Sequence, residues 1–292
     1  MGGLYLESRL DFIRENQNPD GGWGYFPGKV SWFEPTTYAM LALEGAGSEK
    51  ALDRAWKRLR SWQTPEGSFQ PNAQVKEGTW VTAHAVTLAC VHGVDDGNVR
   101  RAVDWLLKVV GAEHSIPMRA FSMLHLLQTK LDVSHEGWPW REGNASWIEP
   151  TVHTLVALKK VANTYRRAEI GYRIREGEKL VLSRRCSDGG WNCGNPNVLN
   201  YDLPSYPETT GLAMIGLGQV DHQTVDVARR FCAETKSSLA KAWLQIALRC
   251  HRQHIDPPQE IAFASRDVML ASLQALGHPQ GNYRLFGAGV QV

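Results

Sequence analysis

The chain has few of the features that mark secreted, membrane-spanning or nucleic-acid-binding proteins. Five irregularly spaced cysteines in 292 residues argue against a disulfide framework and favour a reducing compartment. No run approaches the ~20 apolar residues of a membrane span, and the first residues lack the apolar stretch of a signal peptide. The net charge of +2, from 32 Lys and Arg against 30 Asp and Glu, gives no footprint for nucleic acid. We therefore expect a cytoplasmic protein with no transmembrane segment and no nucleic-acid partner, with peripheral membrane contact left open.

Tryptophan, by contrast, is abundant, and its eleven copies lead to an internal repeat. Three segments share a turn with Gly and Trp, a loop, an acidic residue and an apolar helix. They are 20–43 (DGGWGYFPGKVSWFEPTTYAMLAL), 135–158 (HEGWPWREGNASWIEPTVHTLVAL) and 188–217, which has six extra residues before its Glu. A weaker copy covers 66–89, with Phe69 in place of Trp. The turn tryptophans are interpreted as scaffold: Trp23, Trp138 and Trp191.

The helices on the two sides of each turn differ in character. Those before the turn carry Arg and Lys along one face, whereas those after it are apolar nearly all round, which predicts an outer and an inner ring. The outer type is expected at 4–16, 51–62 and 174–184, and the inner type at 38–43, 152–158 and 211–217. Further helices are expected at 99–110, 118–129, 225–234, 238–250 and 261–276, with the ring position of the first two left open.

Six helical hairpins can close on themselves, so that no exposed apolar end needs a cap. We therefore expect an all-α protein in which residues 1–292 form one domain. The expected fold is a single (α/α)6 toroid of about twelve helices around a central cavity.

The segment from Gln17 to Gly24, with an aligned Thr and an apolar helix after it, resembles the QW motif of squalene and oxidosqualene cyclases. It resembles equally the repeats of protein prenyltransferase β-subunits. This resemblance covers most of the chain and implies the toroid fold. It implies activity less directly, because the repeat is a structural device in both families.

The active-site motifs of those families are missing. Class II cyclases protonate their substrate with an Asp-x-Asp-Asp acid, which does not occur here. Asp95 and Asp96 come closest and are interpreted as a solvated turn. The Asp-x-Cys pair of the prenyltransferase zinc site is also missing. Two clusters lack standard zinc spacing, so no metal site is expected: Cys186, Asp188 and Cys193, and Cys250, His251 and His254.

Acidic residues recur in register at the expected starts of inner helices. Counting back nine residues from the last Leu of four apolar helices gives Glu34, Glu149, Glu208 and Asp267. In a closed ring these carboxylates would meet at one mouth of the cavity. A carboxylate at a helix start is also an ordinary cap, and we favour that role for Glu34 and Glu149, with Pro35 and Pro150 as first helical residues.

Glu208 is the favoured catalytic candidate, because its copy carries the insertion 200–205, which brings Tyr201 and Asp202 beside Tyr206. A carboxylic acid in an apolar cavity has a raised pKa and can act as a general acid, and Asp202 and Glu208 could share one proton.

Aromatic and histidine side chains near the inner helices are the substrate-binding candidates. The aromatic set could stabilise a carbocation, with packing between hairpins as the alternative: Trp32, Tyr38, Trp80, Trp147, Tyr201, Tyr206 and Trp243. His84 and His153 could face the cavity as bases, although core histidines with a backbone partner are commoner.

Three functions follow from this sequence. The first is a proton-initiated terpenoid cyclase-like enzyme, an isomerase or lyase that binds an apolar isoprenoid and needs no cofactor, with magnesium relevant only for a diphosphate substrate. The second is a non-catalytic toroid that binds an apolar ligand or a protein partner. The third is a polysaccharide lyase-like enzyme, suggested by Arg119 and Arg141 near Trp138 and Trp140.

Overall fold

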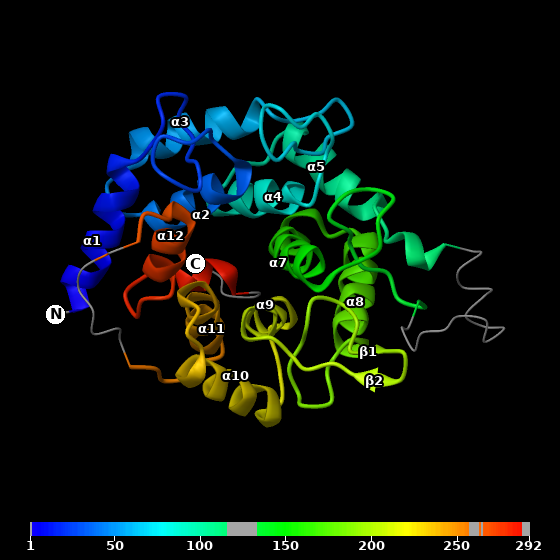
Figure 1. Ribbon diagram of the computed structural model, residues 1–292. Helices are drawn as coiled ribbons and strands as arrows, with labels where there is room; N and C mark the ends of the chain where they lie inside the picture. The colour runs from blue at the N-terminus through cyan, green and yellow to red at the C-terminus, as the bar shows by residue number, and fades with distance from the viewer. Residues whose placement is uncertain (1, 116–132, 257–262, 264, 288–292) are drawn as a thin grey trace.

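The computed structural model describes residues 2–115, 133–256, 263 and 265–287, and within them it is mainly helical (Figure 1). Its α-helices are α1 (Gly2–Glu15), α2 (Phe33–Leu43), α3 (Glu49–Arg60), α4 (Val81–Val91), α5 (Gly97–Lys108), α7 (Ile148–Tyr165), α8 (Ala168–Ser183), α9 (Pro207–Leu217), α10 (His222–Glu234), α11 (Ser238–Cys250) and α12 (Val268–Leu276). The remaining elements are the 3-10 helices η1 (Ala112–His114) and η2 (Tyr283–Phe286) and the strands β1 (Asn197–Val198) and β2 (Tyr201–Asp202).

Six helices form a closed inner ring. They pack in the order α2, α4, α7, α9, α11, α12, and α12 packs back against α2 (Figure 1). The inner helices are buried nearly all round: in α2 every residue except Glu34 is buried. This arrangement confirms the all-α toroid and explains why these helices carry almost no polar face.

The outer helices among the described residues are α1, α3, α5, α8 and α10, and each presents an apolar stripe to the ring. In α3 the stripe is Leu52, Ala55 and Leu59, at helical spacing on an otherwise charged helix. Helix α5 belongs to the outer ring, which settles the position of the segment expected at 99–110. The segment expected at 118–129 lies outside the described residues.

The last inner helix begins later than expected. The described residues 265–267 are not helical, and α12 starts at Val268, after the capping residue Asp267. The start expected at Ile261 lies outside the described residues.

The turn tryptophans join three elements of each repeat. The indole nitrogen of Trp23 donates to the carbonyl of Ile13 at the end of α1 (2.8 Å), and its backbone N–H donates to the Thr36 hydroxyl in α2 (2.8 Å). Trp138 and Trp191 make the same pair of bonds. Their indoles reach Leu106 of α5 (2.7 Å) and Val181 of α8 (2.6 Å), and their backbone N–H groups reach Thr151 (3.0 Å) and Thr210 (3.0 Å). Each tryptophan therefore fixes an outer helix against the following inner one.

Several inner helices begin by donating a backbone N–H to the loop of the neighbouring repeat. The bonds run from Phe33 to Pro71 (2.8 Å), from Ile148 to Cys193 (3.1 Å) and from Val268 to Tyr25 (2.8 Å). The last of these joins the final inner helix to the first loop and so closes the ring. Pro35 and Pro150 are the third residues of their helices and not the first as expected, because the chain becomes helical two residues earlier, at Phe33 and Ile148.

Candidate functional site: an acidic mouth with an aromatic floor

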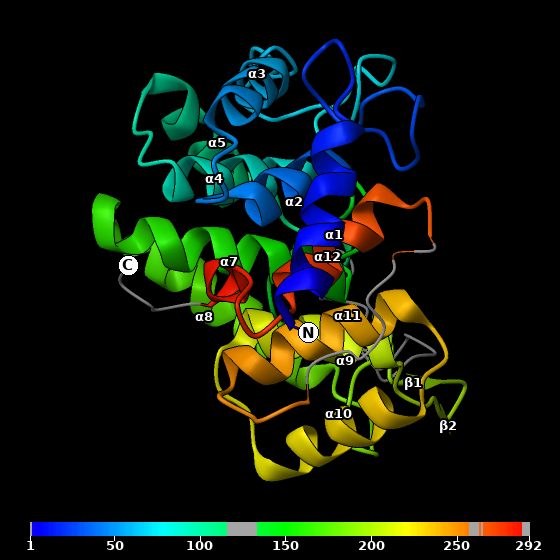
Figure 2. The same cartoon turned by 90° about the vertical axis from the view of Figure 1, so that its left-hand side faces the viewer.

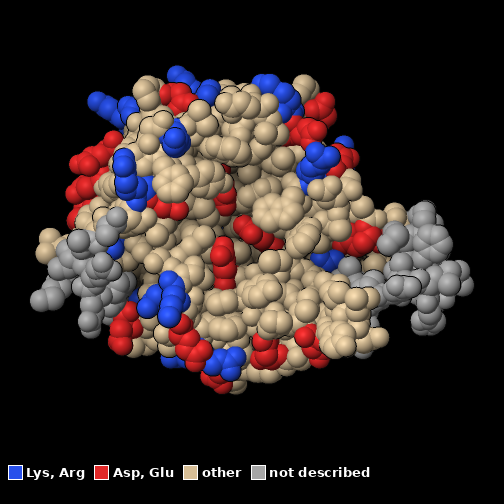
Figure 3. Space-filling model, in the orientation of Figure 1, with Lys and Arg blue, Asp and Glu red and all other residues tan. Residues whose placement is uncertain are grey.

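Three glutamates occupy the same position at the starts of three inner helices. Glu34, Glu149 and Glu208 are the second residues of α2, α7 and α9. Figure 3 views the molecule down the axis of the helical ring. It shows acidic side chains in the central hollow, while basic side chains lie around the periphery. The charges of Glu34 and Glu208 both act on Glu149, and those of Glu208 and Asp267 act on Glu34, so the carboxylates expected at one mouth lie near one another.

Burial raises the pKa of all three carboxyl groups, and repulsion by neighbouring carboxylates adds to the shift at Glu34 and Glu149. Burial, together with the negative charges of Glu34 and Glu208, raises the pKa of Glu149 to about 8. The pKa of Glu34 is raised to about 7, first by burial and then by Glu208 and Asp267, against a hydrogen bond from Tyr25 that lowers it. The pKa of Glu208 is also raised, by burial. At neutral pH Glu149 is therefore mostly a neutral carboxylic acid.

Tyr25 holds Glu34 in place. Its hydroxyl donates to a carboxylate oxygen of Glu34 at 2.5 Å, and burial together with Glu34 raises the pKa of Tyr25 well above its ordinary value. The phenol therefore remains a hydrogen-bond donor over the whole physiological range. Sequence reasoning missed this residue, although it lies two positions after a turn tryptophan.

Capping does not explain the three glutamates. No side-chain hydrogen bond caps these helix starts, where the N-cap residues are Trp32, Trp147 and Tyr206. The first N–H groups of α2 and α7 already bind neighbouring carbonyls, and α9 begins with a proline, which has no N–H. Within the described residues, the carboxyl groups of Glu149 and Glu208 have no hydrogen-bond or ion-pair partner. The capping interpretation favoured from the sequence for Glu34 and Glu149 is not what the geometry shows.

Asp267 is the member of the set that is a cap. It is the N-cap of α12, and its carboxylate accepts from the backbone N–H of Leu270 at 3.0 Å. Its charge still acts on Glu34 and Tyr25. It therefore contributes to the potential of the mouth while holding the helix start.

Below the mouth, buried aromatic and imidazole side chains fill the centre of the toroid. Tyr38, His84, His153 and Trp243 are each at most 3% exposed. The Tyr38 hydroxyl lies 3.5 Å from Nε2 of both histidines. Burial lowers the pKa of His153 to about 3 and that of His84 far below its ordinary value, so both are neutral.

The floor is completed from the opposite end of the ring. Phe286 of η2 packs against Tyr38 and Trp243, with ring centroids 6.3 Å and 5.8 Å apart. Figure 2 shows η2 at the end of the ring away from the hairpin β1–β2 and the repeat loops. The ring therefore opens at its acidic end, and the predicted central cavity is shortened to a bowl above this floor.

Aromatic residues line the rim of the bowl. Half-buried Trp32 packs against Tyr25, with ring centroids 5.8 Å apart. The ring centroid of Trp80 lies 4.8 Å from that of His84 and 5.0 Å from that of Trp140. Two further rings, Trp147 and Tyr206, are 41% and 47% exposed. Trp140 was considered from the sequence only for a polysaccharide-binding role, and the contact with Trp80 brings it to this rim.

The insertion expected to serve the site lies elsewhere. Leu199 and Asn200 both have positive φ and fold the segment into a tight hairpin, β1–β2, which lies at the periphery of the ring in Figure 1. Tyr201 is 76% exposed, and Asp202 accepts a hydrogen bond from Asn197 at 2.7 Å. Asp202 is not among the groups that shift the pKa of Glu208, so the structure does not support a proton shared by the two.

The remaining candidates are structural. Asp96 caps α5, and Asp95 pairs with Arg100 at 3.1 Å, as expected of a solvated turn. Exposed Arg141 pairs with Glu77 at 2.9 Å, and Arg119 lies outside the described residues. In the described part of the chain, no group of three His, Cys, Asp or Glu residues is placed to hold a metal ion. No helix there is both long and apolar enough to span a bilayer.

Comparisons with known proteins support the fold. No family model matches the chain. Over 60 residues the chain is 40% identical to drimenyl diphosphate synthase of Streptantibioticus cattleyicolor, a match that covers 20% of this chain and 11% of that protein.

Two solved structures show the same architecture. The type II terpene cyclase MstE from Scytonema aligns with a TM-score of 0.55 and 19% identity over 85% of this chain and 72% of its own. A family 8 glycosyl hydrolase, an endoglucanase from Klebsiella pneumoniae, aligns with a TM-score of 0.59 and 15% identity over 93% of this chain and 97% of its own. The chain is thus an (α/α) toroid of the kind found in terpene cyclases and in glycosidases.

Proposed function

We propose that the protein cyclises an isoprenoid by protonating a carbon–carbon double bond, with a glutamic acid of the mouth as the proton donor. The observation that carries the proposal is the meeting of Glu34, Glu149 and Glu208 over an aromatic floor. The sequence similarity to drimenyl diphosphate synthase and the structural similarity to a terpene cyclase support the same reaction class.

Glu149 is the favoured proton donor among the three glutamates. Its carboxyl is the most strongly proton-retaining of the three, with a pKa raised to about 8, so that it holds its proton at neutral pH. In the reaction the carboxyl O–H bond breaks, a C–H bond forms at one alkene carbon, and the cation left on the other carbon is attacked by the next double bond. A proton lost from the final cation leaves a new alkene, so the reaction is an isomerisation with no oxidant or reductant.

The aromatic side chains at the mouth are suited to stabilising the carbocation intermediate. Trp32, Trp80 and Trp140 present π-systems, which attract a cation by about 0.5–2 kcal/mol each. The neutral histidines His84 and His153 lie at the base of the bowl, where they are the candidates to accept the final proton.

The acidic character of the mouth restricts which isoprenoid can place its reacting end there. No Lys or Arg is among the groups that shift the pKa of Glu34, Glu149 or Glu208. A diphosphate placed among these carboxyl groups would therefore meet no basic partner, and a magnesium ion would be needed there. This favours an isoprenoid whose reacting end, in the mouth, is hydrocarbon.

The test is product analysis by mass spectrometry after incubation with squalene, farnesyl diphosphate and geranylgeranyl diphosphate. We expect a cyclised product from the wild type and none from Glu149→Gln, which keeps the shape of the neutral acid without a transferable proton. Glu142→Gln, on an exposed residue of the same repeat loop, is the control. If folded wild-type protein converts none of these isoprenoids, the proposal is wrong.

A polysaccharide-cleaving enzyme is the second candidate. It is favoured by the exposed rings Trp147 and Tyr206, which flank Glu149 and Glu208 on the open rim and offer stacking surfaces for sugars, and by the full-length overlap with an endoglucanase. Release of reducing ends from soluble cellulose or mannan would support it. Absence of both activities, with a folded protein, leaves a toroid that binds an apolar ligand or a protein partner.

A further inference from the structure

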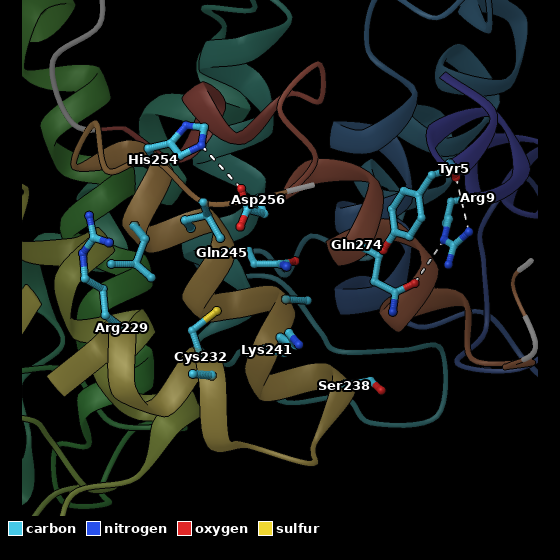
Figure 4. A pocket seen from close by; sticks show the side chains of 14 residues that line it. Tyr5, Arg9, Arg229, Cys232, Ser238, Lys241, Gln245, His254, Asp256 and Gln274 are labelled. Carbon is cyan, nitrogen blue, oxygen red and sulfur yellow. Dashed lines mark hydrogen bonds and ion pairs between the residues drawn. The ribbon is translucent and has the colours of Figure 1, made fainter. Parts of the chain in front are cut away.

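A second hollow, of about 700 Å³, lies outside the inner ring between α1, α10, α11 and α12 (Figure 4). This volume falls in the ~300–1,000 Å³ range of small-molecule sites.

The described side chains that line this hollow are mainly basic where they are charged, whereas those of the mouth are acidic. Its lining includes the cations Arg9, Arg229 and Lys241, from three different helices. Lys241 forms no ion pair with the described residues, and Arg229 donates to the amide of Gln253 at 2.8 Å. Lys241 and Arg229 have no carboxylate partner among the described residues, and basic groups of this kind favour an anionic ligand.

The third cation is held in a fixed orientation. The guanidinium of Arg9 lies 3.6 Å from the centre of the Tyr5 ring, and its Nε donates to Gln274 at 3.1 Å. Among the described lining residues one is acidic, Asp256, and its carboxylate lies 3.6 Å from the exposed imidazole of His254. Basic side chains therefore outnumber acidic ones among the described lining residues.

A buried amide points into the same space. Gln245 is only 6% exposed, lines the hollow, and has no hydrogen-bond partner for its side chain among the described residues. Figure 4 shows it on the wall of the hollow formed by α11, which also carries Lys241. A buried polar side chain that faces only a cavity indicates a group that meets a ligand or water there.

We propose that this hollow binds a phosphate-bearing amphiphile. Lys241, Arg229 and the amide of Gln245 would contact the phosphate oxygens. The hydrocarbon part would lie against an apolar wall that includes Ala242, Leu248 and Ile255. The ligand could be a free molecule or a membrane lipid, since both present the same phosphate.

The test is isothermal titration calorimetry of the full chain with octyl phosphate and with inorganic phosphate. We expect one site for octyl phosphate and an affinity on the order of tenfold lower in Lys241→Gln and in Gln245→Leu, the loss typical of one charge-assisted or buried hydrogen bond. Arg230→Gln is the matched control, because it removes the same charge from an exposed position on α10 that does not line the hollow. Its affinity should equal that of the wild type.

Two results would overturn the proposal: no heat with octyl phosphate, or an unchanged affinity in the double variant Arg229→Gln with Lys241→Gln. Flotation with phosphatidylcholine vesicles, with and without phosphatidic acid, separates the two sources. Binding to the acidic vesicles alone, lost in the double variant, assigns a lipid, whereas octyl phosphate binding without flotation assigns a free ligand.

Discussion

Replacement of Glu149 by Gln should make the protein more stable at alkaline pH and leave it nearly unchanged in acid. In the folded state burial raises the pKa of this carboxyl from 4.5 to about 8, so the folded chain holds a proton that the unfolded chain has released. The folded state then binds more protons than the unfolded state between these values, and stability falls as pH rises through that window. At about 1.4 kcal/mol per pH unit the full effect is roughly 5 kcal/mol. Because Glu34 and Glu208 share the repulsion, we expect about 3–5 kcal/mol for this single change.

The assay is urea unfolding at pH 5 and pH 9, followed by circular dichroism. Gln imitates the neutral acid, so the two proteins should have similar unfolding free energies at pH 5, and the variant should be more stable at pH 9. Glu142→Gln, which is exposed, should show no such difference between the two pH values. An equal effect of Glu149→Gln at both pH values would refute the conclusion that this group is held protonated.

Three further results are expected. Cyclisation should slow as pH rises above about 8, because Glu149 then loses the proton it must donate; a rate unchanged up to pH 10 would exclude it as the acid. Tyr25→Phe removes a hydrogen bond that favours the ionised form of Glu34, so the pKa of Glu34 should rise above about 7 in a carbon-13 NMR titration, and a lower value would contradict the assignment. Thr210→Val leaves the buried backbone N–H of Trp191 unpaired and should cost about 1–3 kcal/mol in urea unfolding, whereas no loss would mean that another acceptor replaces the hydroxyl.

The sequence by itself determined the architecture. A repeated turn followed by a helix that is apolar all round has few ways to be buried, and closing the hairpins into a ring is one that leaves no apolar end exposed. The same repeat placed Glu34, Glu149 and Glu208 in register. Their convergence followed, because equivalent positions of a closed ring face one end.

Only the tertiary structure decided what those residues do. The sequence favoured capping at Glu34 and Glu149, since a local pattern cannot show that a neighbouring loop already accepts the helix N–H. It favoured Asp202 as a partner of Glu208, but two residues with positive φ turn that segment outward. The raised pKa of Glu149, the filled floor around Tyr38 and the basic hollow beside α11 all depend on contacts between segments far apart in the chain, which no local pattern encodes.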